Sequence, residues 1–416
     1  MAKNNNQLKL RLIIMNFLQF AIWGAWLISL GAYLGGSLHY TGAQIGSFFS
    51  TMGIAALFMP TLMGIVADKW VPAERLITLC HILSGALLFF AAQQTDYTTL
   101  YTLMLLSVCF YMPTLGLTNS VAFGKMMAAG MDTVKEFPPI RVFGTIGFIV
   151  SMWIVDLGGF KMNNMQFYIA SFFSFALAAY MMSFKPTRIE KRAKDQKVSW
   201  SERLGLQAFS LFKKKHIAIF FIFSFLLGIC LQITNSYAND YLTNYFGKMP
   251  EYADTFGVKY SGVLISLSQI SEALCILLIP FFLKRYGIKV VMMISILAWV
   301  IRFGLLGAGN PGDGVWMLII SMLVYGVAFD FFNVSGALYV DQCAPKKLRN
   351  SAQGVFLMMT NGFGSYFGPL LASRVVDHYN GMGQYHIAWY VFAGYAAVVL
   401  VAFYLLFHEK KEIKGI

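Results

Sequence analysis

Long apolar stretches recur along almost the whole chain, and they limit its possible folds more than any other feature. One runs from Leu12 to Leu34, and another fills most of 315–340. Of the 416 residues 58% are hydrophobic and only 12% are charged, whereas soluble domains carry about 25% charged residues. A helix needs roughly 20 apolar residues to cross the hydrocarbon of a bilayer. Since the sequence lacks the alternating pattern of barrel strands, we expect an all-α polytopic membrane protein.

The apolar runs predict twelve transmembrane helices. Their approximate limits are 11–34, 43–67, 75–94, 98–123, 138–158, 165–184, 216–245, 258–283, 288–308, 315–340, 349–374 and 385–407. Most connections are short, but the charged segment 185–215 separates six helices from the other six. We therefore expect an N-terminal six-helix bundle at 1–184, a cytoplasmic linker with short amphipathic helical pieces at 185–215, and a C-terminal six-helix bundle at 216–416.

Basic residues gather on one side of this predicted topology. The sequence has 32 Lys and Arg residues, and most lie in the two terminal tails, the linker and the connections on the linker's side. The exceptions are Lys161, Lys248, Lys259 and Arg374 on the other side, and Arg141 and Arg302 inside spans. Because basic connections stay in the cytoplasm, both termini are predicted to be cytoplasmic. The same asymmetry accounts for the net charge of +13, so we expect no nucleic-acid partner.

The cysteines and glycines give no sign of a metal or cofactor site. No two of the five cysteines have CxxC spacing, so neither a disulfide framework nor a metal site is expected. The glycine-rich segment "NGFGSYFG" follows no predicted strand and is no dinucleotide loop. The first apolar run is too long for a signal peptide and is predicted to be the first span. We expect no cofactor and no enzymatic activity.

A short loop motif connects this topology with a known transporter design. The segment "GIVADKW" after the second predicted helix resembles the loop signature of the major facilitator superfamily, with Gly64, Asp68 and Lys69 at its glycine, acidic and basic positions. The corresponding segment of the second half, "FFLKRYGIK", lacks the aspartate. Only the first copy is therefore expected to act as a full conformational latch. The superfamily's fold has two six-helix bundles around a central cavity.

Two acidic residues are predicted near the middle of the membrane. Asp330 precedes Asp341 by 11 residues, which is about 16 Å of helix. Glu272 lies midway between Lys259 and Lys284 in another span. A charged side chain at that depth costs about 2.5–3.5 kcal/mol, so such residues are functional by default. The alternative is a structural ion pair with one of the two arginines inside spans.

Other polar side chains share helix faces with these acids or lie on neighbouring spans. Residues three or four positions apart lie on one face of a helix. The pairs and stripes with this spacing are Gln232 and Asn235; Gln269 and Glu272; Tyr325, Phe329 and Asn333; Asp330 and Asn333; and Arg141, Thr145 and Phe148. We expect these faces to line a central cavity, although each amide has the alternative of pairing with a neighbouring helix.

The side chains on these faces suit a neutral ligand that joins a planar heterocycle to a sugar. Amides supply paired donors and acceptors, carboxylates accept hydrogen bonds from hydroxyl groups, and aromatic rings stack on planar rings. A plain sugar would also use the acids and one aromatic ring. An anionic substrate is disfavoured, because Arg141 is the only plausible cation in the cavity.

The chain resembles the bacterial nucleoside:proton symporter family from its first predicted helix to its last. The matching segments are "FLQFAIWGAWL", "GIAALFMPTLMGIVADKW", "YMPTLGLTN", "FPPIRVFGTIGF", "LQITN", "ISLSQISE", "VYGVAFDFFNVSG" and "GVFLMMTNGFG". The resemblance implies proton-driven uptake of purine and pyrimidine nucleosides, such as uridine and adenosine, across the bacterial inner membrane. It also implies these binding residues: Gln232, Asn235, Gln269, Glu272, Tyr325, Phe329, Asp330, Arg141, Thr145 and Phe148.

The implied mechanism is alternating access around a site at the membrane midplane. We expect Asp330 to be the main proton-coupling group and Glu272 a second titrating or ligand-binding acid, in a monomeric protein. Two other classes remain open. A proton-coupled oligosaccharide symporter has the same helices and buried acids, and competition of sugars against uridine would identify it. A receptor or partner subunit would bind ligand without moving it, so a counterflow assay would distinguish it.

Overall fold

Helices make up nearly all of the chain in the computed structural model, which describes residues 2–187, 206–344 and 349–408. No strand occurs within these ranges. Nine of the described helices are long and apolar enough to cross a membrane. The all-α prediction is therefore confirmed for the described chain. The predicted linker, 185–215, lies mostly outside the described residues, because only 185–187 and 206–215 of it are described.

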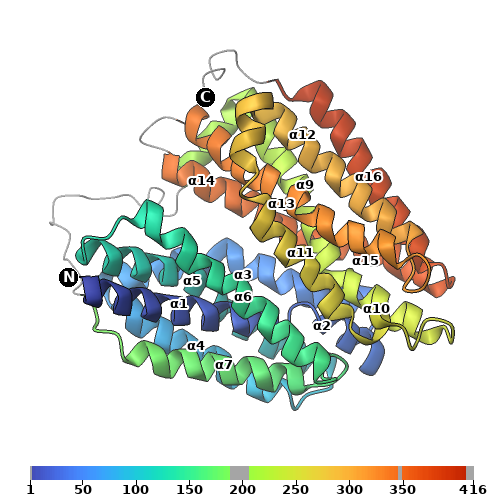
Figure 1. Cartoon of the computed structure of the whole chain (residues 1–416), viewed down its shortest axis with the longest axis horizontal. Helices are drawn as coiled ribbons and strands as arrows, with labels where there is room; N and C mark the ends of the chain where they lie inside the picture. The colour runs from blue at the N-terminus through green and yellow to red at the C-terminus, as the bar shows by residue number, and fades with distance from the viewer. Residues whose placement is uncertain (1, 188–205, 345–348, 409–416) are drawn as a thin grey trace. The chain divides into compact units, whose positions relative to one another are not determined.

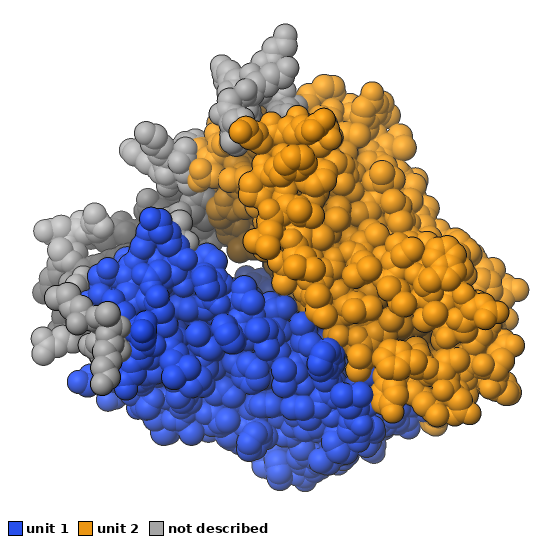
Figure 2. Space-filling model, in the orientation of Figure 1, with its two compact units in different colours: residues 1–38, 54–197 blue, residues 39–53, 198–416 orange. Residues whose placement is uncertain are grey.

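The chain divides into two compact units, coloured separately in Figure 2. Unit 1 comprises 1–38 and 54–197, and unit 2 comprises 39–53 and 198–416. The helix α3 (Gly42–Lys69) contributes its first part to unit 2 and its remainder to unit 1. Each unit is described by itself below.

Unit 1 is a bundle of long helices, in which α1 packs on α6, and α4 packs between α5 and α7 (Figure 1). Its remaining elements are α1 (Ala2–Gly24), α2 (Leu30–Ala32), the π-helix η1 (Tyr33–Ser37), α4 (Ala73–Ala91), α5 (Tyr97–Ala128), α6 (Thr133–Leu157) and α7 (Met165–Met182). The predicted span 11–34 is thus not one continuous α-helix, since α1 ends at Gly24. A methyl group at Gly24 would lie 2.8 Å from Phe148 Cα, so this glycine permits the close approach of α1 and α6.

Unit 2 is a second bundle, in which α12 packs against both α13 and α16, and α13 packs against α11 (Figure 1). Its first elements are η2 (Leu206–Lys213), α9 (Lys215–Asp240), the π-helix η3 (Tyr241–Tyr245), η4 (Phe246–Lys248), α10 (Phe256–Lys259) and α11 (Ser261–Cys275). They are followed by α12 (Ile279–Ala308), α13 (Val315–Cys343), α14 (Arg349–Leu357), the π-helix η6 (Met358–Phe363), α15 (Gly364–Gly381) and α16 (Tyr385–Leu406).

Two predicted spans of this half are interrupted in the structure. The predicted helix 258–283 is divided into α10, α11 and the start of α12. Within α12, Gly287 has φ 76° and ψ 171°, so the helical path breaks there as the predicted turn between 283 and 288 requires. The predicted helix 349–374 contains the π-helix η6 between α14 and α15. Hydropathy along the sequence does not register interruptions as short as these.

Candidate functional site

The carboxyl group of Asp330 is buried in α13. Its residue is 3% exposed, and its Oδ2 atom has no hydrogen-bond partner among the described residues. The neighbouring acid is Glu272 on α11, which acts electrostatically on Asp330. Burial disfavours a charged carboxylate, and a second negative charge nearby disfavours it further.

The expected alternative, an ion pair between Asp330 and an arginine, does not form. None of the ion pairs within the described ranges includes Asp330. Arg302 on α12 is 1% exposed; it donates from Nη1 to the carbonyl oxygen of Ser321 at 2.6 Å and lies 3.4 Å from Ser268 Oγ. Its guanidinium carbon is 4.8 Å from the ring centroid of Tyr325. Arg302 thus joins α11, α12 and α13 and supports an aromatic residue of the predicted site.

Tyr325 and Phe329 form a parallel aromatic pair on α13. Their ring centroids are 5.7 Å apart and their planes differ by only 4°. Trp299 of α12 meets Tyr325 edge-on at 6.0 Å. Gln269 on α11 is close enough to interact with the Tyr325 hydroxyl group. Tyr325 is buried against both Arg302 and Trp299, and it in turn supports the ring of Phe329. The half-buried Phe329 therefore presents a rigid, flat apolar surface.

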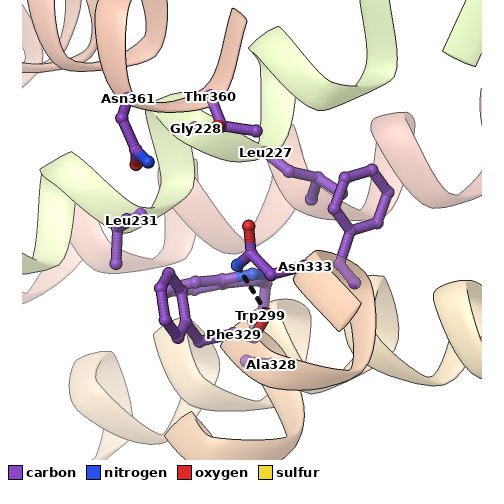
Figure 3. Close-up of a pocket in the computed structure, with 10 residues that line it drawn as sticks. Leu227, Gly228, Leu231, Trp299, Ala328, Phe329, Asn333, Thr360 and Asn361 are labelled. Atoms are coloured by element: carbon purple, nitrogen blue, oxygen red, sulfur yellow. Dashed lines mark hydrogen bonds between the residues drawn. The ribbon is translucent and has the colours of Figure 1, made fainter. Parts of the chain in front are cut away.

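Phe329 also lines a pocket within unit 2 (Figure 3). The space among the lining atoms is about 270 Å³, open solvent included. The lining comes from α9, α12, α13 and η6 and comprises Leu227, Gly228, Leu231, Trp299, Ala328, Phe329, Phe332, Asn333, Thr360 and Asn361. The pocket is apolar apart from a few polar groups, as ligand sites commonly are.

The amides predicted on α9 lie beside this pocket and are absent from its lining. Gln232 is buried and donates from Nε2 to Ser365 Oγ on α15 at 2.7 Å. Its Oε1 atom has no hydrogen-bond partner within the described chain. Asn235 is half-buried one turn further along α9. Gln232 therefore pairs with a neighbouring helix through its amide nitrogen, but its amide oxygen does not take part in that pairing.

Three predicted residues lie together on α6 in unit 1. The Arg141 guanidinium carbon is 3.9 Å from the ring centroid of Phe20 on α1, which places the cation over an aromatic face. Thr145 follows one turn later and is half-buried, and Phe148 is buried. Trp23 of α1 meets Phe148 edge-on at 6.4 Å. The other seven predicted residues all lie in unit 2.

The loop motif lies at the end of a helix rather than in an open loop. Gly64, Asp68 and Lys69 are all within α3, and the chain turns directly after them at Trp70 and Val71. The side chains of Asp68 and Lys69 are outside the described part of the structure. Their role as a latch stays a prediction.

Several pocket residues have no distinguishing pattern in the sequence. Trp299 and Leu231 are apolar residues in apolar runs, so only packing reveals that they face the pocket. Asn333 and Asn361 offered a signal, since amides within spans are uncommon, and Asn333 shares a face with Asp330. The sequence does not reveal that these two amides belong to one pocket.

A family model and relatives that are nearly half identical to this chain identify its family. Residues 6–412 of the chain match the family model that is described as nucleoside H⁺ symporter. The nucleoside permease NupG of Escherichia coli (strain K12) is 48% identical over 97% of this chain and 96% of its own length. The xanthosine permease of the same organism is 46% identical over 97% of this chain and 98% of its own. A crystal structure of the nucleoside transporter NupG covers 97% of this chain and 100% of its own, with a TM-score of 0.90.

Proposed function

The chain belongs to the nucleoside H⁺ symporter family, and we propose that it takes up purine and pyrimidine nucleosides together with protons. Its fold is that of the major facilitator superfamily, and it is a multi-pass membrane transporter rather than an enzyme. The substrates we propose include uridine and adenosine. The membrane is the bacterial inner membrane, with both termini in the cytoplasm as the basic connections predict.

One observation carries the proposal beyond family membership: a buried acid lies on the same helix as a stacked aromatic pair. Asp330 follows Phe329 directly, and its carboxyl group is buried without an ion-pair partner in the described chain. The aromatic pair supports stacking of a nucleobase, and the acid supports exchange of a proton. Both therefore belong to one short segment of α13.

We assign proton coupling to Asp330, with Glu272 as the second acid. Protonation removes a charge that burial opposes, so it favours a state in which the cavity closes around substrate. Release of the proton into the cytoplasm restores the charge and opens the cavity. Each proton that crosses an inward-negative potential contributes about 2.3 kcal/mol per 100 mV, which is sufficient to accumulate a neutral nucleoside.

The proposed substrate contacts are the aromatic pair, the neighbouring amides and the acids of unit 2, together with the α6 residues of unit 1. They are Gln232, Asn235, Gln269, Glu272, Tyr325, Phe329, Asp330, Arg141, Thr145 and Phe148. We propose that two six-helix bundles, 1–184 and 216–416, alternate access to this site as a monomer, with twelve spans and the linker 185–215 between the bundles. In this cycle Gly64, Asp68 and Lys69 form the conformational latch.

The test of proton coupling is the Asp330→Asn variant in proteoliposomes. Asparagine keeps the size of the side chain but cannot exchange a proton. We expect uridine counterflow to persist while accumulation driven by an imposed pH gradient is lost. The matched control is Asp313→Asn, which changes an exposed acid in the connection before α13 and should leave both assays unaltered. Full gradient-driven accumulation by Asp330→Asn would show that the coupling assignment is wrong.

A further inference from the structure

Two asparagine side chains point into the pocket of unit 2 from opposite walls (Figure 3). Asn333 comes from α13 and Asn361 from η6. They are 28 positions apart in the sequence, and neither is among the binding residues that the family resemblance implies. Amides at this position add hydrogen-bonding capacity to a pocket that is otherwise mainly apolar.

Asn333 retains most of its hydrogen-bonding capacity for a ligand. Its Nδ2 atom donates one hydrogen bond, at 2.8 Å, to the carbonyl oxygen of Phe329 on its own helix. That bond fixes the orientation of the amide and leaves one N–H and both lone pairs of Oδ1. Asn333 is half-buried and lines the pocket, so these groups are available to a ligand there.

Asn361 is placed by an unusual backbone segment. It lies in the π-helix η6, and single π-helical turns within α-helices occur frequently at functional sites. The segment is held against α9 by close backbone packing, because a methyl group at Gly228 would lie 3.0 Å from Thr360 Cα. The Thr360 hydroxyl group is used internally, 3.1 Å from the carbonyl oxygen of Phe356. Asn361, which is exposed, is therefore the polar group that η6 offers to the pocket.

The ring of Phe329 lines the same pocket as these two amides. One of its faces is stacked on Tyr325, and the ring lines the pocket. A planar ligand that stacks on Phe329 would direct its edge toward the side chains around it. An amide can donate and accept at once, which is why asparagine can make paired hydrogen bonds with the edge of a nucleobase.

We propose that Asn333 and Asn361 form a base-recognition pair that hydrogen-bonds the polar edge of the nucleobase. This proposal rests on the proposed function and specifies which group of the substrate the pocket recognises. Because each amide can present either a donor or an acceptor, the pair accepts bases with an amino group and bases with a carbonyl group at that edge. A base with neither substituent offers only its ring nitrogens at that edge and gains less from the pair.

Three purine nucleosides with different groups at carbon 6 test the proposal. Adenosine carries an amino group there, inosine a carbonyl group, and purine riboside neither. Binding to purified protein is measured for the wild type, Asn333→Leu and Asn361→Leu, since leucine has a similar size but no polar atoms. We expect the dissociation constants of adenosine and inosine to rise roughly tenfold in each variant. That of purine riboside should stay within about a factor of two.

The matched control is Asn380→Leu, the same substitution at an exposed position near the end of α15 and outside the pocket. It should alter none of the three affinities. Should a leucine variant fail to fold, the alanine variants at the same two positions replace it, because they only shorten the side chain. Thermal unfolding without ligand confirms that each protein compared is folded.

Each outcome of the experiment decides the proposal. Equal weakening of all three nucleosides would assign the amides to the ribose or to packing, and unchanged affinities would remove them from the site; either result overturns the base-recognition pair. If the wild type binds and transports no nucleoside at all, the proposed function fails instead. Selective loss of adenosine and inosine, with purine riboside retained, is the result that supports it.

Discussion

Replacement of Gly228 by alanine tests how closely the pocket depends on the packing of α9 against η6. A methyl group at this position would overlap the carbonyl oxygen of Thr360 and would lie 3.0 Å from its carbonyl carbon and Cα. Ordinary van der Waals contact begins at 3.4 Å, so the two backbones must move apart, and they must do so most at the carbonyl oxygen. These are backbone atoms and cannot rotate away as a flexible side chain can.

The expected cost of this overlap is about 1–3 kcal/mol of stability, the usual range for overpacking, with the upper end favoured because backbone must move. The displacement would also shift Asn361, the next residue of η6. We therefore expect Gly228→Ala to lower the thermal unfolding temperature and to weaken uridine binding in purified protein. Both effects share one cause, so they should appear together.

Gly354→Ala provides the matched control for this experiment. Gly354 lies in α14, one element before η6, and a methyl group there would meet nothing within 4 Å. Alanine favours helix over glycine by about 1 kcal/mol, so this variant should be as stable as the wild type or slightly more so. If Gly228→Ala proves as stable and as active as Gly354→Ala, the close packing of η6 on α9 does not position the pocket.

Two further predictions concern an amide pair and a buried ion pair. Gln232→Ala and Asn235→Ala should each weaken uridine binding roughly tenfold while the protein stays folded, because each removes an amide from the proposed site; unchanged affinity in both would exclude them. The ammonium group of Lys125 lies 2.8 Å from the carboxylate of Glu74, whose side chain is only 1% exposed. Lys125→Met should destabilise unit 1 by about 3 kcal/mol, because it leaves this buried carboxylate without its partner charge. Thermal unfolding measures this loss, and Glu74→Gln added to Lys125→Met should recover part of it; no recovery would mean that the charge is not the cause.

The fold was largely predictable because its causes are local. Apolar runs of sufficient length form helices in a bilayer whatever surrounds them, since each helix satisfies its own backbone. The predicted limits of α4, α7 and α16 therefore agree with the structure to within a few residues. The breaks at Gly24 and in η6 were not predicted, because close contacts with other helices accompany them: Gly24 meets Phe148, and η6 meets Gly228.

The candidate site was predictable only in part. Polarity inside apolar runs singled out Asp330 and Glu272 as candidates, because a charged side chain inside a membrane span is costly whichever way its helix is turned. The direction of each amide was not predictable in this way. Gln232 and Asn333 have similar patterns in the sequence, but Gln232 is turned toward Ser365 and Asn333 toward the pocket.

By itself, the sequence determined that this protein is a helical membrane transporter and which family it resembles, and it predicts at what depth its acids lie. These properties follow from the length, polarity and order of residues along one chain. Only the tertiary structure decided that Arg302 supports Tyr325 rather than neutralising Asp330, and that Asn333 and Asn361 share a pocket. The physical reason is that rotation of each helix about its axis is set by packing against residues distant in sequence, and that rotation selects which side chains meet.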